Sequence, residues 1–285
     1  MSALKLSGVG KRFGGLEAVA DLSLSIEPGV VTGLIGPNGA GKSTIVNLIT
    51  GILAPTAGHI SIGEVPLARM EPNEVARAGV ARTFQNVRLL RETSVRDNIV
   101  IGCHRHERTS LLANLFGMPA VWRERRDFRA RASKLLEDFG MTRYADMAAG
   151  GLSYGHQRRV EVMRALAMEP KYLLLDEPVA GMSDDETERT GELFLSLAGK
   201  HSLVVVEHDM AFVAKIARKV TVLHEGSVIA EGALSHRPEQ SRQARESAIS
   251  FPRKNLNQYT LFGRQGNKMA RQPLGQSRKL SVFGR

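Results

Sequence analysis

Cysteine is almost absent from this sequence of 285 residues, which contains only Cys103. A single cysteine cannot form an internal disulfide, so nothing in the sequence points to an oxidising compartment. There is no run of about 18 apolar residues that could cross a membrane. The first residues also lack the long apolar stretch of a signal peptide. We therefore expect a cytoplasmic chain that does not itself span a membrane.

The composition is otherwise ordinary, at 42% hydrophobic and 24% charged residues. A chain of this length can bury a sizeable core as one large domain or two modest ones. Wholesale disorder and collagen-like repeats are excluded.

The net charge of +10 is concentrated at one end of the chain. Residues 234–285 hold eleven of the 39 Lys and Arg residues but only two of the 29 Asp and Glu residues, a net charge of +9. The first 233 residues are almost neutral, so the basicity is no argument that the whole protein binds nucleic acid. Beyond about residue 234 the sequence fades into Arg, Gln, Ser, Asn and Gly, a composition typical of disorder.

Hydrophobic patterning predicts a core of strands and helices that is interrupted by a helical segment. Short apolar runs punctuated by Gly predict several strands over residues 4–35, the last of them buried at 30–35. Further elements are predicted as buried strands at 172–175 and 203–206, a helix at 43–52, and a hairpin over 220–232 that turns at Glu225-Gly226. The helical segment, at about 87–150, shows helical spacing at 95–102, 111–116 and 122–139.

The strongest motif is G-P-N-G-A-G-K-S-T at residues 36–44, between a predicted strand and a predicted helix. Glycines let successive backbone N–H groups curve around phosphate oxygens, and the helix points its positive dipole end at the same anion. Lys42 would reach the β- and γ-phosphates, and the Ser43 hydroxyl would bind Mg²⁺. The predicted phosphate-binding residues are Gly36, Asn38, Gly39, Ala40, Gly41, Lys42, Ser43 and Thr44. The alternative, an incidental glycine-rich turn, is disfavoured by the strand and helix on either side.

A second apolar strand ends in two acids, Asp176 and Glu177. Asp176 is placed to hold Mg²⁺, directly or through water, and Glu177 to polarise the attacking water. Such a pair alone is often a helix cap, so this prediction depends on the phosphate loop.

Three weaker signals accompany these motifs. His208 follows the strand at 203–206, which we expect beside the Asp176 strand, and Gln85 lies where the core gives way to the helical segment. Ser153 and Gly155 open a helix, which makes a second N-terminus able to bind an anion. The alternatives are a packing histidine, an ordinary Gln and a simple capped helix, and spacing alone favours the capped helix.

Over about residues 4–233 these motifs resemble, in order, those of the ATP-binding subunits of ABC transporters. The matching elements are 36–44 (Walker A), Gln85 (Q-loop), 152–157 (signature), 173–177 (Walker B) and His208 (switch histidine). The resemblance implies an α/β fold over residues 1–233, with a P-loop ABC ATPase core containing a mixed sheet, an antiparallel β subdomain and an inserted helical subdomain at about 87–150. It leaves 234–285 as a basic, disordered tail.

The same resemblance implies an ATPase whose cofactors are ATP and Mg²⁺. Glu177, His208 and Gln85 would be catalytic, and Gln85 would join Ser43 and Asp176 at the metal. In a head-to-tail dimer, each ATP would lie between the Walker A of one copy and residues 153–155 of the other. Phe13 falls where relatives stack an aromatic ring on adenine, with a core phenylalanine as the alternative.

A narrower resemblance is to the subunits that serve branched-chain amino acid importers, carried by residues 13–19, 82–86 and 108–112. Residues 178–182 are similar to urea-transporting relatives. This implies an ATPase that energises an importer for branched-chain or related amino acids. A urea or amide importer and a lipid-exporting ATPase are alternatives. A soluble ABC protein acting on nucleic acid or ribosomes is disfavoured by the single Walker A motif.

The implied partners are transmembrane permease subunits, docked on the helical insertion near Gln85, and a second ATP-binding subunit of the same or a related chain. A solute-binding protein would act indirectly, and no specific nucleic acid is expected. The implied location is peripheral, at the cytoplasmic face of the inner membrane.

Several positions depart from the family pattern. Tyr154 and His156 stand in the signature where Gly and Gln are usual, and Ser183 replaces the D-loop aspartate, which weakens the expectation of coupling across the dimer there. The sequence after about residue 240 does not resemble the branch. It could contact anionic lipid or a permease, bind nucleic acid non-specifically, or come from translation in an altered frame. We favour the altered frame because the match is close up to the point where it stops.

Overall fold

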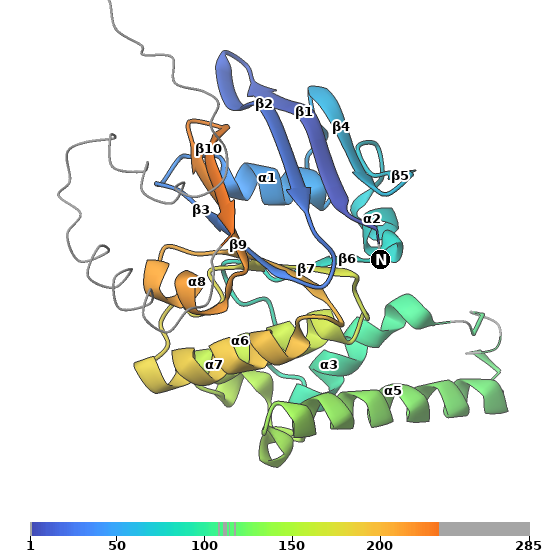
Figure 1. Cartoon of the computed structure of the whole chain (residues 1–285). Coiled ribbons are helices and arrows are strands. Elements are labelled where there is room, and N and C mark those ends of the chain that lie inside the picture. Colours follow the sequence, from blue (N-terminus) through green and yellow to red (C-terminus); the bar gives the residue numbers. More distant parts are fainter. Residues whose placement is uncertain (1, 108, 111–112, 114, 117, 234–285) are drawn as a thin grey trace, which may run out of the picture. The chain divides into compact units, whose positions relative to one another are not determined.

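The computed structural model describes residues 2–233 except 108, 111–112, 114 and 117 (Figure 1). The predicted disordered tail therefore lies outside the described residues, as do three of the six residues of the helix predicted at 111–116. Within the part that is described, none of the helices combines the length and the apolar character needed to cross a membrane.

A six-stranded mixed sheet carries most of the predicted motifs. Its order is β10-β9-β3-β8-β7-β6, in which β10 is antiparallel to β9 and all other neighbours are parallel. The strands are β3 (Val31–Ile35), β6 (Val80–Arg82), β7 (Tyr172–Asp176), β8 (Ser202–Val206), β9 (Lys219–His224) and β10 (Ser227–Ala233). The predicted buried strands and hairpin are confirmed. Glu225 and Gly226 both have positive φ, 46° and 76°, as a tight two-residue hairpin turn requires.

A second sheet of four antiparallel strands has the order β2-β1-β4-β5. Its strands are β1 (Leu4–Phe13), β2 (Leu16–Ile26), β4 (Ala57–Ile62) and β5 (Val65–Pro66). Along β1, Leu4 and Leu6 are buried while Lys5 between them is exposed, the alternation expected where one face covers a core.

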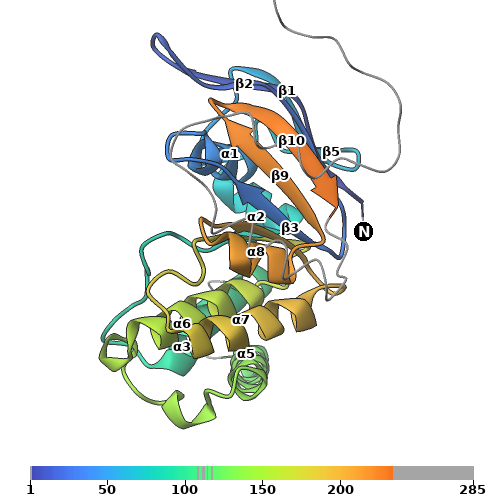
Figure 2. The ribbon, with the colours of Figure 1, turned by 60° about the vertical axis from the view of Figure 1, so that its left-hand side comes forward.

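Helices lie on both faces of the six-stranded sheet (Figures 1 and 2). In both views α1 lies between the two sheets, whereas α3, α5, α6 and α7 gather on the opposite side of the six-stranded sheet. The helices are α1 (Lys42–Ile49), α2 (Pro72–Ala78), α3 (Val95–Cys103), α5 (Pro119–Asp138), α6 (Tyr154–Leu166), α7 (Asp184–Leu197) and α8 (Met210–Ile216), with single 3₁₀ turns at His104–His106, Thr142–Tyr144 and Ala149–Gly151. The predicted mixed sheet, antiparallel subdomain and helical insertion are confirmed.

Two predicted helix ends differ from the structure. The helix predicted at 43–52 ends at Ile49, because Gly51 takes φ 73° and stops the winding. The helix predicted at 122–139 starts earlier, at Pro119, a residue whose fixed φ suits a first helical turn.

Alternation along β7 divides the hydrophobic residues into two cores. Leu173 and Leu175 belong to the core beneath α3, α5, α6, α7 and α8. Tyr172 and Leu174 belong to the core that contains α1 and the antiparallel sheet. Since both faces are covered, this strand is a continuous apolar run until it reaches Asp176. The two cores fix where the carboxyl end of the sheet presents its polar residues.

Candidate functional site

The glycine-rich motif forms the loop from β3 into the first turn of α1. Gly41 precedes the helix with φ 97°, and a Cβ there would lie 2.8 Å from the Ala18 carbonyl oxygen. At Gly36 a Cβ would lie 2.4 Å from the Leu223 carbonyl oxygen. No side chain caps α1 and its first turn holds no acid, so its leading N–H groups and positive dipole end suit an anion.

The other motif residues divide into an exposed rim and a buried base. Asn38, Gly39 and Ser43 are exposed, whereas Ala40 is buried and accepts a hydrogen bond from the Gly226 N–H at 3.1 Å. Thr44 is half-buried. The loop is thus fastened to the β9–β10 turn while its polar rim stays accessible to a ligand.

Lys42 folds back over this loop. Its Nζ donates to the carbonyl oxygens of Gly36 at 2.7 Å and Pro37 at 2.9 Å. Burial lowers the pKa of Lys42, against the opposing effect of the Glu177 and Asp176 carboxylates. An ammonium group partly removed from water beside uncapped helix N–H groups fits the phosphates of a nucleotide.

Glu177 lies at the meeting point of the three candidate catalytic side chains. Its Oε1 is 3.0 Å from Nε2 of His208, and its Oε2 accepts a 3.4 Å hydrogen bond from Nε2 of Gln85. The predicted adjacency of the strands is confirmed, because β7 pairs with β8 in parallel and Asp176 lies opposite Val206. Residues separated by up to 123 positions in the sequence are thereby brought to one sheet edge.

Asp176 is buried at the end of β7, with 6% of its surface exposed. Burial raises the pKa of its carboxyl group, although the guanidinium of Arg82, 4.0 Å away, opposes the shift. Among the described residues, no group of three or more His, Cys, Asp or Glu side chains is arranged so that it could hold a metal ion by itself. The Ser43 hydroxyl and the Asp176 carboxylate suit Mg²⁺, which favours oxygen ligands and keeps several waters. Phosphate oxygens and water would complete its coordination shell.

Ser153 is the N-cap of α6 and contacts His156. Its Oγ accepts from the His156 N–H at 3.5 Å and lies 2.6 Å from His156 Nδ1. Gly155 is buried, and a Cβ there would lie 3.0 Å from Oε1 of Glu186. The helix that Ser153 caps, α6, and the helix that follows the glycine-rich loop, α1, pack into different cores on opposite faces of the sheet (Figure 1).

Phe13 lies at the end of β1 and is 45% exposed. Lys11 Nζ lies 5.1 Å from the centre of its ring. The alternative that Phe13 is a core residue is wrong, and its ring is available to stack on a flat ligand.

The comparisons with known proteins agree with this geometry. Residues 19–180 match the family model described as ABC transporter. The high-affinity branched-chain amino acid transport ATP-binding protein BraF of Pseudomonas aeruginosa is 41% identical over 241 residues, 84% of this chain and 93% of that protein. The chain belongs to the ABC transporter family.

Solved structures of ABC cassettes share the fold. A nucleotide-free ATP-binding cassette is similar with a TM-score of 0.72 and 32% identity, over 88% of this chain and 96% of that one. A dimeric cassette bound to ADP and phosphate is similar with a TM-score of 0.69 and 26% identity, over 82% of this chain and 100% of that one. This ABC protein is the ATP-hydrolysing subunit of an importer, so the predicted fold, nucleotide binding and ATPase activity are confirmed.

The departure at the D-loop has a structural explanation in this ABC ATPase. Ser183 is the N-cap of α7: its Oγ accepts from the Glu186 N–H at 3.4 Å, and Glu186 accepts from the Ser183 N–H at 3.0 Å. This reciprocal capping box stabilises the helix start, which a serine does as well as an aspartate.

Three residues beneath the ABC site escaped the sequence analysis. Arg82 pairs with Asp176, and Arg158 and Glu161 form a buried ion pair under the Gln85 and Glu177 loops. Arg and Glu three positions apart on a helix ordinarily indicate a solvated face. The one available signal is their position among Gly155, Val160 and Val162 in the buried part of α6.

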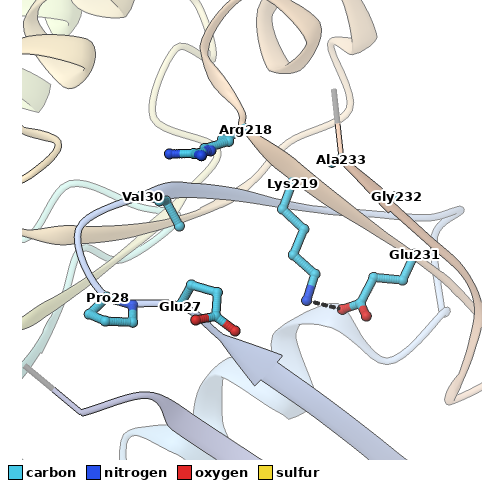
Figure 3. A pocket seen from close by; sticks show the side chains of 8 residues that line it. All are labelled: Glu27, Pro28, Val30, Arg218, Lys219, Glu231, Gly232 and Ala233. Carbon is cyan, nitrogen blue, oxygen red and sulfur yellow. Dashed lines mark ion pairs between the residues drawn. The ribbon is translucent and has the colours of Figure 1, made fainter. Parts of the chain in front are cut away.

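Among the hollows on the described surface of the ABC protein, two lie near features described above. One, of about 280 Å³, adjoins the Q-loop and is lined by Asn86, Val87, Leu89, Arg91, Tyr154 and Gln157. The other, of about 520 Å³, is lined by Glu27, Pro28, Val30, Arg218, Lys219, Glu231, Gly232 and Ala233 (Figure 3). Val30 precedes β3 and the glycine-rich loop follows it, so the larger hollow lies at the strand's other end.

Proposed function

We propose that this chain is the ATPase of an importer for branched-chain amino acids, and that it hydrolyses Mg²⁺-ATP as one of two head-to-tail ATP-binding subunits. The solute assignment rests on the 41% identity to a branched-chain amino acid transport protein. The hydrolytic assignment is carried by one observation, the Glu177 carboxylate held between His208 and Gln85.

Each group has a defined part in the proposed reaction. The N–H groups at the start of α1 and Lys42 would hold the phosphates, while Ser43, Asp176 and Gln85 would serve Mg²⁺. The metal would neutralise charge that develops on the phosphate oxygens. Glu177 would accept a proton from the attacking water, and His208 would keep its carboxylate oriented.

The second half of the ATP site would come from the partner. Ser153 and Gly155 start α6, which packs on the opposite face of the sheet from α1, and a similar cassette is dimeric with bound ADP and phosphate. Phe13, exposed on β1, would stack on the adenine.

Separate permease subunits would dock where the helical insertion at about 87–150 meets the core of the domain formed by residues 1–233. The hollow lined by Val87, Arg91 and Tyr154 also includes Asn86, the residue after Gln85. A permease docked in this hollow would therefore contact the chain one residue away from the site. Bound there, the chain would lie peripherally at the cytoplasmic face of the inner membrane, and the solute-binding protein would act on it only through the permease.

Purification from native membranes tests this function. The full chain should co-purify with permease subunits, and the reconstituted complex should couple ATP hydrolysis to uptake of labelled leucine or isoleucine. The Val87→Asp variant should lose the permease while still binding ATP. Ile229→Asp, at an exposed apolar residue of β10, is the matched control and should keep it. A complex that transports a different solute would contradict the substrate, and a chain without ATPase activity would contradict the whole proposal.

A further inference from the structure

Arg158 and Glu161 form an ion pair inside α6. Arg158 Nη1 lies 2.8 Å from Glu161 Oε2, and both side chains are 1% exposed. Burying two charges removes their hydration, and well-packed apolar residues often stabilise a fold as much as such a pair does. The presence of this pair therefore calls for a role beyond stability.

On one side, the pair holds the backbone just before Gln85. Glu161 Oε1 accepts a 3.2 Å hydrogen bond from the Phe84 N–H, and Arg158 Nη1 donates to the Phe84 carbonyl oxygen. The same Nη1 lies 3.5 Å from the carbonyl oxygen of Gln85. Both hydrogen-bonding groups of the Phe84 backbone are thus committed to α6.

On the other side, the guanidinium holds the end of β7. Arg158 Nη2 donates to the carbonyl oxygen of Asp176 and, at 3.0 Å, to that of Glu177. Glu177 has φ 48°, a left-handed conformation that is uncommon for a residue with a side chain and costs free energy unless its surroundings hold it. Its N–H is fixed to the Val206 carbonyl oxygen at 2.8 Å, so Arg158 completes the restraint.

A planar guanidinium offers several donors in a fixed fork, which lets one side chain bridge two loops at once. Arg158 lies only one turn into α6, whose N-cap is Ser153. We propose that the Arg158–Glu161 pair positions the Glu177 carboxylate. When the signature helix α6 moves as it binds the ATP held by the partner subunit, the pair transmits that movement to Gln85 and Glu177 of its own subunit. This inference rests on the proposed function and names the side chains that couple its two half-sites.

Arg158→Lys tests the positioning role. Lysine keeps the charge opposite Glu161, but its one nitrogen cannot occupy both positions from which Nη1 and Nη2 of Arg158 reach the Phe84 and Glu177 carbonyl oxygens. We expect a melting temperature close to the wild type and an ATP dissociation constant within about threefold of it, whereas kcat falls at least about tenfold and the Hill coefficient for ATP approaches 1. A purely structural residue would not separate kcat from binding in a variant that remains folded.

A matched control removes a different ion pair. Lys219 Nζ lies 2.8 Å from Glu231 Oε1, between β9 and β10 at the larger hollow (Figure 3). The Lys219→Met/Glu231→Gln variant should keep wild-type kcat and cooperativity. If Arg158→Lys is folded and keeps kcat within about twofold of the wild type with unchanged cooperativity, the positioning role is overturned.

Further measurements decide the question if Arg158→Lys does not fold. The double variant Arg158→Met/Glu161→Leu removes both charges and fills the space with apolar side chains, and it should show the same loss of kcat. If that variant is also unfolded, amide exchange in the wild type decides: the Phe84 N–H should be protected, and its exchange should change when ATP drives dimerisation. Rapid exchange there, or no response to ATP, overturns the proposal. A wild type that neither binds nor hydrolyses ATP rejects the proposed function instead.

Discussion

Nε2 of His208 lies 3.0 Å from Oε1 of Glu177, and this contact joins the carboxyl ends of two neighbouring parallel strands. A general base must keep a lone pair aimed at the proton that it will take. By occupying one carboxylate oxygen, His208 restricts how Glu177 can turn, and Gln85 restricts it from the other side.

Glu177→Gln should bind ATP as the wild type does and lose at least about a hundredfold in kcat, because an amide cannot accept the proton of water. ATP should then hold two subunits together long enough for size-exclusion chromatography to detect the dimer. Glu225→Gln, the same change in the β9–β10 turn, is the control and should remain active. Substantial hydrolysis by Glu177→Gln would remove Glu177 from the role of base.

Lys42→Ala should weaken ATP binding and hydrolysis together, with the dissociation constant rising by about tenfold or more. The ammonium group lies over the loop carbonyls and would contact phosphate, and charge-assisted hydrogen bonds of this kind are about twice as strong as neutral ones. Calorimetric titration with ATP measures the effect. An unchanged dissociation constant would place the phosphates elsewhere.

Ser153→Arg should leave ATP binding by the monomer nearly unchanged while abolishing ATP-driven dimerisation and cooperative hydrolysis. The substitution adds bulk and charge at the start of α6, which packs on the opposite face of the sheet from α1 and its glycine-rich loop. Equilibrium binding and light scattering report the two properties separately. Wild-type turnover by this variant would mean that the serine is only a helix cap.

Asp176→Asn should change how the stability of the nucleotide-free protein depends on pH. Burial raises the pKa of Asp176 above its ordinary value of 3.8, so the folded state holds this proton more tightly than the unfolded chain does. The resulting stability is complete below pH 3.8 and is lost as the pH rises through the raised pKa. Melting curves from pH 4 to 7 should therefore show a smaller loss in the variant. If the melting temperatures of the two proteins changed equally with pH, Asp176 would not be the source of this pH dependence. The variant should also lose stabilisation by Mg²⁺ with ATP.

Truncation after Ala233, where β10 ends, should leave kcat and ATP binding within about twofold of the wild type. All proposed site residues precede this point, His208 being the last of them. The net charge would fall from +10 to +1, so binding to a cation exchanger should weaken. If the truncated chain no longer associated with the permease, residues 234–285 would be needed for permease binding.

The sequence was sufficient to predict the structure wherever a short local pattern determines a single local conformation. The motif at 36–44 requires a strand, a tight loop and a helix, and β3 and α1 supply them. The continuous apolar run at 172–175 likewise predicted a buried strand, because a strand that is covered on both faces has apolar side chains at every position.

Tertiary contacts explain what the sequence could not predict. Arg158 and Glu161 look like a solvated helical pair until the Phe84 and Glu177 backbones are placed over them. Gly155 was predicted as part of a helix start that can bind an anion, but its spacing did not indicate that the Glu186 side chain of α7 lies next to it. These relationships depend on how α6 packs against the rest of the fold, which no local spacing encodes.

Strand β7 also limits how the chain can vary. Tyr172 and Leu174 fill one core, while Leu173 and Leu175 fill the other. Inserting or deleting a single residue would exchange the two sets and turn the Asp176 side chain to the wrong face of the sheet. The strand can therefore accept single substitutions but not a change in its length. Natural variants that differ in length should have their insertions and deletions in the connections around it.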